Sequence, residues 1–151
     1  MKNIFDAKDV QYFTDRMEKL NTNTQPLWGK MNATQMLAHL NVSYEMIFEP
    51  GKHPAPKGMM KVLLKWLVKP KVTNEKPYKK SSPTAPSFII TDTRDFEKEK
   101  ARLSTFMQQV QGLGAKHFEG KASLSFGVLN HQQWNNMLAK HLEHHFGQFG
   151  V

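Results

Sequence analysis

The sequence predicts an all-α protein, specifically a four-helix bundle with a long crossover between its second and third helices. Four segments repeat apolar residues at intervals of three and four, which is the period of a helix with one buried face. About forty residues separate the second of these segments from the third, far more than the short loops that join antiparallel helices. The chain has 151 residues. That length suits a single domain, residues 1–151, which would bury roughly 68–70% of the surface of its unfolded chain.

The first two helices are marked by capping residues and by apolar stripes. The first is predicted to follow Asp6, whose side chain can accept a hydrogen bond from the first turn. The second is predicted to begin after Asn32, which forms a capping box with Gln35, and to stop at Pro50-Gly51. The two stripes consist of Val10, Phe13, Met17 and Leu20, then of Met36, Leu37, Leu40, Tyr44 and Ile47.

The third and fourth helices are also marked by capping residues and by apolar stripes. The third is predicted to start near Asp92 or Thr93 and to end in the glycines of "GLGA", residues 112–115. The fourth begins after Asn130, which forms a second capping box with Gln133. Their inward positions are Phe96, Leu103, Phe106, Val110 and Leu113, then Trp134, Leu138, His141, His145 and Phe149.

The crossover contains an amphipathic stretch, "KGMMKVLLKWLVKP", with a lysine at every fourth position, followed by a proline-rich irregular chain. A crossover of this length would let the second and third helices run parallel. We expect the stretch to form a helix that packs over one end of the bundle. The alternative is a basic amphipathic segment that uses Trp66 as an anchor at a membrane surface. Farther along the chain, "SLSFGVL" predicts a short extended piece.

The formal net charge of +8 is concentrated in residues 52–80, where Glu75 is the only acid. Nine lysines lie in this segment: Lys52, Lys57, Lys61, Lys65, Lys69, Lys71, Lys76, Lys79 and Lys80. Such a segment can attract a phosphate-rich partner, anionic lipid or an acidic substrate, or it can simply solubilise the surface. Lys61 and Lys65 are the candidate anion-binding residues.

Several classes of protein are excluded or disfavoured. The chain has no cysteine, which fits a reducing compartment. Its N-terminus lacks the apolar region of a signal peptide, and no apolar run approaches the roughly 20 residues of a transmembrane helix. We therefore expect a cytoplasmic protein. No helix-turn-helix, RNA-binding or zinc-finger signature is present, so specific recognition of nucleic acid is not expected.

The histidines near the C-terminus carry the strongest chemical signal. His141 and His145 are four residues apart and share the predicted inner face of the last helix. Burying an unpartnered polar ring costs about 1–3 kcal/mol, and a cation held by both rings would remove that cost. His39 lies at the edge of the apolar stripe of the second helix. Three neutral imidazoles inside a bundle would form an open site for a divalent ion such as zinc or nickel.

Neighbouring residues fit this site less well. The HExxH motif of zinc proteases is absent, because Leu142 rather than glutamate follows His141. His144 lies about 100° around the helix from the ligand face, so it should contact a ligand ring or solvent, and Glu143 should be a solvated charge. Gln148 is placed to hydrogen-bond a ligand ring. The remaining histidines look incidental: His53, His117 and His131.

Two segments, "WGKMNATQMLAHL" and "KHLEHHFGQF", resemble the DinB/YfiT-like superfamily of metalloenzymes. The resemblance implies a four-helix bundle with a long link between its second and third helices, and His39, His141 and His145 as metal ligands. Phe146 stands where many relatives carry arginine. Similar proteins include transferases that use bacillithiol, mycothiol or glutathione, a mycothiol-dependent isomerase and metal-dependent hydrolases, and many are dimers. The sequence looks closest to a branch whose biochemical role is not established.

The sequence leaves two functions open, together with a bundle that keeps its histidines without turnover, which it does not separate from the first. The first is a metal-dependent enzyme, a thiol-dependent transferase or a hydrolase, acting on a small molecule such as a low-molecular-weight thiol. No clear general base stands out, and Tyr44 and Glu45 are weak candidates for that role. The alternative is a non-catalytic, stress-related binding protein that uses the basic 52–80 segment for an anionic partner.

Overall fold

The computed structural model describes residues 1–151 and is all-α apart from one small hairpin. Its long helices are α1 (Ala7–Glu18), α2 (Ala33–Phe48), α5 (Phe96–Phe118) and α6 (His131–Gln148). The crossover carries α3 (Gly58–Leu63), a π-helix (Leu64–Val68), α4 (Lys69–Thr73) and a 3-10 turn (Pro86–Phe88). Strands β1 (Ala122–Ser123) and β2 (Gly127–Val128) pair antiparallel, where the sequence predicts an extended piece.

The caps that start the long helices are largely those expected from the sequence. Asn32 with Gln35, and Asn130 with Gln133, form complete capping boxes, and Asp6 accepts a hydrogen bond from the Lys8 amide. α5 begins about three residues later than the sequence predicts. Asp95 is its cap, because the Asp95 side chain accepts from the Lys98 amide, whereas Asp92 pairs with the Arg94 guanidinium.

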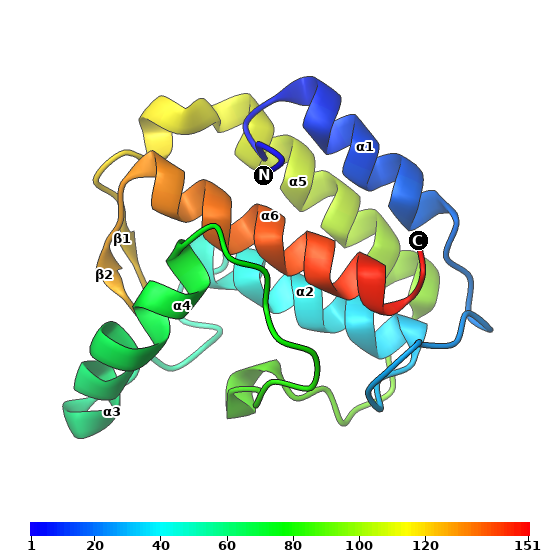
Figure 1. Ribbon diagram of the computed structural model, residues 1–151, viewed down its shortest axis with the longest axis horizontal. Helices are drawn as coiled ribbons and strands as arrows, with labels where there is room; N and C mark the ends of the chain where they lie inside the picture. The colour runs from blue at the N-terminus through cyan, green and yellow to red at the C-terminus, as the bar shows by residue number, and fades with distance from the viewer.

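The long helices share one apolar core. α2 packs mainly on α5, α6 contacts both of them, and α1 covers α5 and α6. Figure 1 shows that α2 and α5 run in one direction and that α1 and α6 run in the other, an arrangement that the long crossover permits. The stripes predicted for the four helices are buried with few exceptions, Leu113 among them at 40% exposure.

The predicted end of the third helix coincides with a break in α5. Gly114 has φ of 72° and ψ of 167°, so regular helical geometry stops there and the chain turns before continuing to Phe118. A positive φ of this kind is accessible to glycine without a steric penalty. The turn buries Phe118, whose ring centroid lies 5.4 Å from that of Phe5 and 5.5 Å from that of Trp134.

The crossover departs from the expectation of a helix packed over the bundle. Of the amphipathic stretch only the last part, α4, packs against the long helices: Lys140 and Asn136 of α6 donate hydrogen bonds to the carbonyls of Lys71 and Thr73. α3 projects away from the long helices (Figure 1). The π-helix lies just before Pro70, which lacks the N–H that would continue regular α-helical bonding. No helix of the molecule combines the length and the apolar character needed to cross a bilayer.

Candidate metal centre

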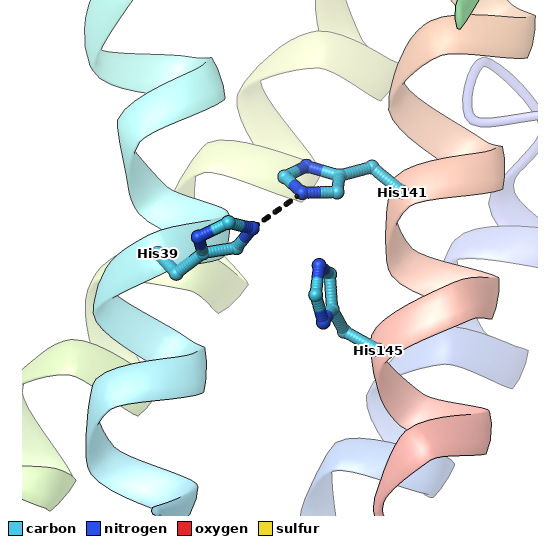
Figure 2. A group of neighbouring side chains, drawn as sticks. All are labelled: His39, His141 and His145. Carbon is cyan, nitrogen blue, oxygen red and sulfur yellow. Dashed lines mark hydrogen bonds between the residues drawn. The ribbon is translucent and has the colours of Figure 1, made fainter. Parts of the chain in front are cut away.

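The three predicted histidines converge between α2 and α6. His39 comes from α2, and His141 and His145 come from successive turns of α6, so that the rings point toward one another (Figure 2). One nitrogen from each ring lies within 4.8 Å of the other two. His39 and His145 are 4% and 7% exposed, and His141 is partly exposed. The i,i+4 spacing of α6 and the packing of α2 against it are sufficient to assemble the group.

The outer nitrogens of two rings are fixed by groups that determine their tautomers. His39 Nδ1 lies 2.9 Å from the carbonyl oxygen of Phe88. A carbonyl can only accept, so Nδ1 carries the proton and His39 Nε2 presents a lone pair to the centre. His145 Nδ1 lies 2.8 Å from Oε1 of Gln148. The Gln148 amide is itself oriented, because its Nε2 donates to the carbonyl of Trp28 at 2.6 Å.

His141 is less constrained, and its partner was not identified from the sequence. Its Nδ1 lies 3.0 Å from the hydroxyl of Ser43, which can donate or accept. Its Nε2 lies 2.9 Å from His39 Nε2, the contact drawn as a dashed line in Figure 2. Two lone pairs at that distance would repel. Either His141 Nε2 donates to His39 while Ser43 donates to Nδ1, or Nδ1 donates to Ser43 and a cation lies between the two rings. Ser43 is four residues after His39, and that spacing was the available signal.

All three imidazoles are held in the neutral form that metal coordination requires. Burial lowers the pKa of His39 from 6.5, although the hydrogen bond to the Phe88 carbonyl opposes this. Burial, reinforced by the other imidazoles, holds the pKa of His141 well below 6.5. Burial and the proximity of His39 lower the pKa of His145 to about 3. The site is therefore a set of three uncharged nitrogen donors at neutral pH.

The separations suit one small ion. Nitrogens bound tetrahedrally to zinc at 2.0–2.1 Å lie about 3.3–3.4 Å apart. The 2.9 Å separation of the two Nε2 atoms and the upper limit of 4.8 Å for the group bracket that value. Ligating histidines usually donate their second N–H to a carbonyl or carboxylate, and His39 and His145 already donate to oxygen acceptors. The cluster could hold a metal ion, and its donor set does not select among zinc, nickel and other ions that imidazole binds.

The sequence model of one family, described as "Protein of unknown function (DUF1569)", matches residues 4–150. The chain belongs to the DUF1569 family. No curated protein and no solved structure matches the chain.

Aromatic side chains surround the cluster. The Phe88 ring lies 5.3 Å from the His39 ring and 5.9 Å from the His141 ring, measured between centroids. His144 is half-buried, outside the converging group, and its ring contacts that of His145 at 5.0 Å, which agrees with its predicted place beside a ligand. The rings of Trp28 and Tyr78 flank His144 at 6.0 and 5.6 Å. The crossover thus contributes both Tyr78 and Phe88 to the walls of the site.

The weak candidates for a general base are engaged elsewhere. Burial raises the pKa of Glu45, but hydrogen bonds from Lys52, His53 and Arg102 outweigh burial and lower it to about 2. Tyr44 is buried and stacks on Phe106, and burial raises its pKa. Neither side chain can take up a proton near neutral pH.

The remaining predicted residues lie away from the cluster or have other roles. Lys61 and Lys65 are exposed on α3 and the π-helix. Glu143 is not a free charge, because it pairs with Arg16. His53 is not incidental either, since its Nε2 lies 2.7 Å from the Glu45 carboxylate. The other two histidines make local contacts only: His117 with Lys121, and His131 with Glu119.

Proposed function

We propose that this DUF1569 chain is a metal-dependent enzyme in which His39, His141 and His145 hold one divalent transition ion, zinc or nickel. The supporting observation is the hydrogen bonding of the outer nitrogens, which leaves the Nε2 atoms of His39 and His145 unprotonated toward a common centre. A cluster that existed only to fill the core would not need two rings oriented in this way.

We further propose that the fold is a DinB/YfiT-like four-helix bundle. Four long helices with one shared core support this assignment, as does a long connection between α2 and α5. The resemblance of their two segments implies that the three histidines occupy the positions of that superfamily's metal ligands.

The proposed reaction is a thiol-dependent transfer or a hydrolysis on a small molecule. An ion bound by three imidazoles lowers the pKa of a bound thiol or water and polarises an electrophile. The chain's own residues orient the ligands. The Phe88 carbonyl accepts a hydrogen bond from His39, and Gln148 accepts one from His145. The Ser43 hydroxyl can donate to or accept from His141 Nδ1, so it suits either tautomer of that ring. Because Tyr44 and Glu45 cannot accept a proton, we favour a thiol, which needs no separate base once its pKa is lowered.

Metal analysis of untagged protein tests the proposal. We expect about one equivalent of a transition metal per chain, with His141→Ala and His145→Ala each losing most of it. His144→Ala is the matched control on the same helix and should retain the metal. A stoichiometry near zero after incubation with zinc or nickel, or equal loss in all three variants, would contradict the site. A screen of loaded protein with small thiols and electrophiles then addresses the reaction.

A further inference from the structure

Residues 57–68, comprising Lys57, α3 and the π-helix, form an arm with an unusual concentration of exposed apolar side chains. Their exposed fractions range from 45% for Leu63 to 86% for Met59, and Trp66 is 71% exposed. The six residues concerned are Met59, Met60, Val62, Leu63, Trp66 and Leu67. They make up six of the twelve exposed large hydrophobic residues of the molecule, within nine consecutive positions. Apolar patches of this kind mark interaction surfaces.

The same arm carries positive charge that nothing in the molecule neutralises. Lys57, Lys61 and Lys65 are exposed. Their spacing of four places Lys61 and Lys65 on one side of the helix, and Lys57 lies at its N-cap. Among the lysines of residues 52–80, only Lys52 is ion-paired, with Glu45 and Glu49. The only acid of the segment is Glu75. The partner of the arm must therefore offer apolar contact and negative charge together.

The base of the arm is fixed to the body of the molecule. Lys69 Nζ donates to the Val128 carbonyl at 2.9 Å, and Lys140 of α6 donates to the Lys71 carbonyl at 2.8 Å. Thr73, at the end of α4, is buried. The tip, in contrast, extends away from α2, α5 and α6 (Figure 1). A partner bound to the tip would thus be held in a defined orientation relative to the body.

We propose that this arm docks on an anionic lipid surface, lying in the headgroup region without crossing the bilayer. A second copy of the chain would bring two sets of unpaired lysines together, which is unfavourable. Nucleic acid would neutralise the lysines but leave the apolar side chains in water. An anionic membrane satisfies both, because lysines interact with headgroups while Trp, Leu and Met side chains enter the boundary with the acyl chains. This proposal does not depend on the metal centre.

Vesicle sedimentation with the whole 151-residue chain tests the proposal. We expect binding to phosphatidylcholine vesicles that contain phosphatidylserine, little binding to phosphatidylcholine alone, and weakening as salt is raised. Each lysine near an anionic surface contributes a factor of about five in partitioning. Lys61→Glu with Lys65→Glu should therefore reduce binding at least about twentyfold. The control pair, Lys30→Glu with Lys116→Glu, changes the net charge equally at exposed positions off the arm and should bind nearly as the parent does.

The apolar contribution has its own variants. Leu63→Ser should reduce binding several-fold, whereas Leu113→Ser, at a similarly exposed position on α5, should not. Trp66 fluorescence should shift to shorter wavelength on vesicles, and Trp66→Phe should abolish the shift while retaining most of the binding.

Three results would overturn the proposal. The first is equal binding to neutral and anionic vesicles, or no binding to either. The second is dimerisation through the arm, detected by sedimentation velocity and removed by Trp66→Ser, without vesicle binding. The third is binding to duplex DNA that depends on Lys61 and Lys65 but not on Trp66, again without vesicle binding.

Discussion

Gln148 links the loop before α2 to the histidine cluster through two hydrogen bonds. Its Oε1 accepts from His145 Nδ1, and its Nε2 donates to the Trp28 carbonyl. Gln148→Leu keeps the volume but removes both bonds, so His145 loses the group that fixes its tautomer. We expect metal affinity to fall about 10- to 100-fold, the usual effect of removing a partner of a ligand, measured by competition with a chelator. Gln132→Leu, which also removes a side-chain hydrogen bond on α6, should leave the affinity unchanged.

Gly29 lies against the Gln148 amide, so a substitution at Gly29 also tests the link between Gln148 and His145. It has φ of +88°, and a Cβ atom built there would lie 2.4 Å from Gln148 Nε2. Gly29→Ala should therefore push the amide away from His145 and reduce metal affinity in the same direction as Gln148→Leu. Gly51→Ala is a close control, because Gly51 has φ of +87° but open space around its Cβ position. Equal effects of the two alanines on metal affinity would mean that backbone strain, and not displacement of Gln148, is responsible.

At the scale of elements, Lys140 determines how the crossover is attached. Its Nζ donates to the Lys71 carbonyl and to both oxygens of Asn74, at the end of α4. Lys140→Met preserves the apolar stem but removes the hydrogen bonds that the buried, charged Nζ donates to the exposed residues Lys71 and Asn74, at a cost of about 1–3 kcal/mol in unfolding free energy. We expect faster amide hydrogen exchange in residues 69–73, measured by mass spectrometry. Lys71→Met, at an exposed position of α4, should change neither quantity.

The sequence predicts the bounds of these elements correctly where the residues that fix them are close neighbours in the chain. The capping boxes that begin α2 and α6 involve residues three apart, and both were correct. The start of α5 is less certain from the sequence, because Asp92, Thr93 and Asp95 all have cap-forming side chains. In the structure Asp92 pairs with its neighbour Arg94, and Asp95 accepts the capping bond from the Lys98 amide. The arm was misplaced for a related reason. Its sequence pattern shows that the helix has an apolar face, but it does not show whether the rest of the molecule covers that face.

In the histidine site, too, the sequence predicts contacts between residues about one helical turn apart and misses contacts from distant segments. The i,i+4 pair on α6 and the apolar stripe around His39 were sufficient to predict convergence. Gln148 was predicted as a partner because it lies one turn from His145. Phe88 was not, because its carbonyl reaches His39 from a segment 49 residues away through an irregular turn. No periodic pattern encodes that contact.

At the scale of the whole molecule, the buried histidines make the stability of metal-free protein depend on pH. Their pKa values are lowered on folding, to about 3 for His145, while the unfolded chain titrates near 6.5. Below pH 6.5 the unfolded state therefore binds more protons, and the unfolding free energy falls as pH decreases. The loss should stop once the pH is below the folded-state values, where both states are protonated.

Urea unfolding between pH 7.5 and 5 measures this effect, to which half-buried His144 also contributes because burial lowers its pKa. Glu45, the most strongly stabilised carboxylate, titrates at about 2 when folded and at 4.5 when unfolded, so its contribution is lost only at lower pH. Each buried histidine should cost up to about 1.4 kcal/mol per pH unit below 6.5. Saturating zinc should hold the stability higher at pH 7.5 and make its decline steeper, because protons then compete with the ion for the same nitrogens. An unfolding free energy that is constant from pH 7.5 to 5 in the metal-free protein would mean that the three rings are not buried in the neutral form, and the donor set inferred from their hydrogen bonds would be wrong.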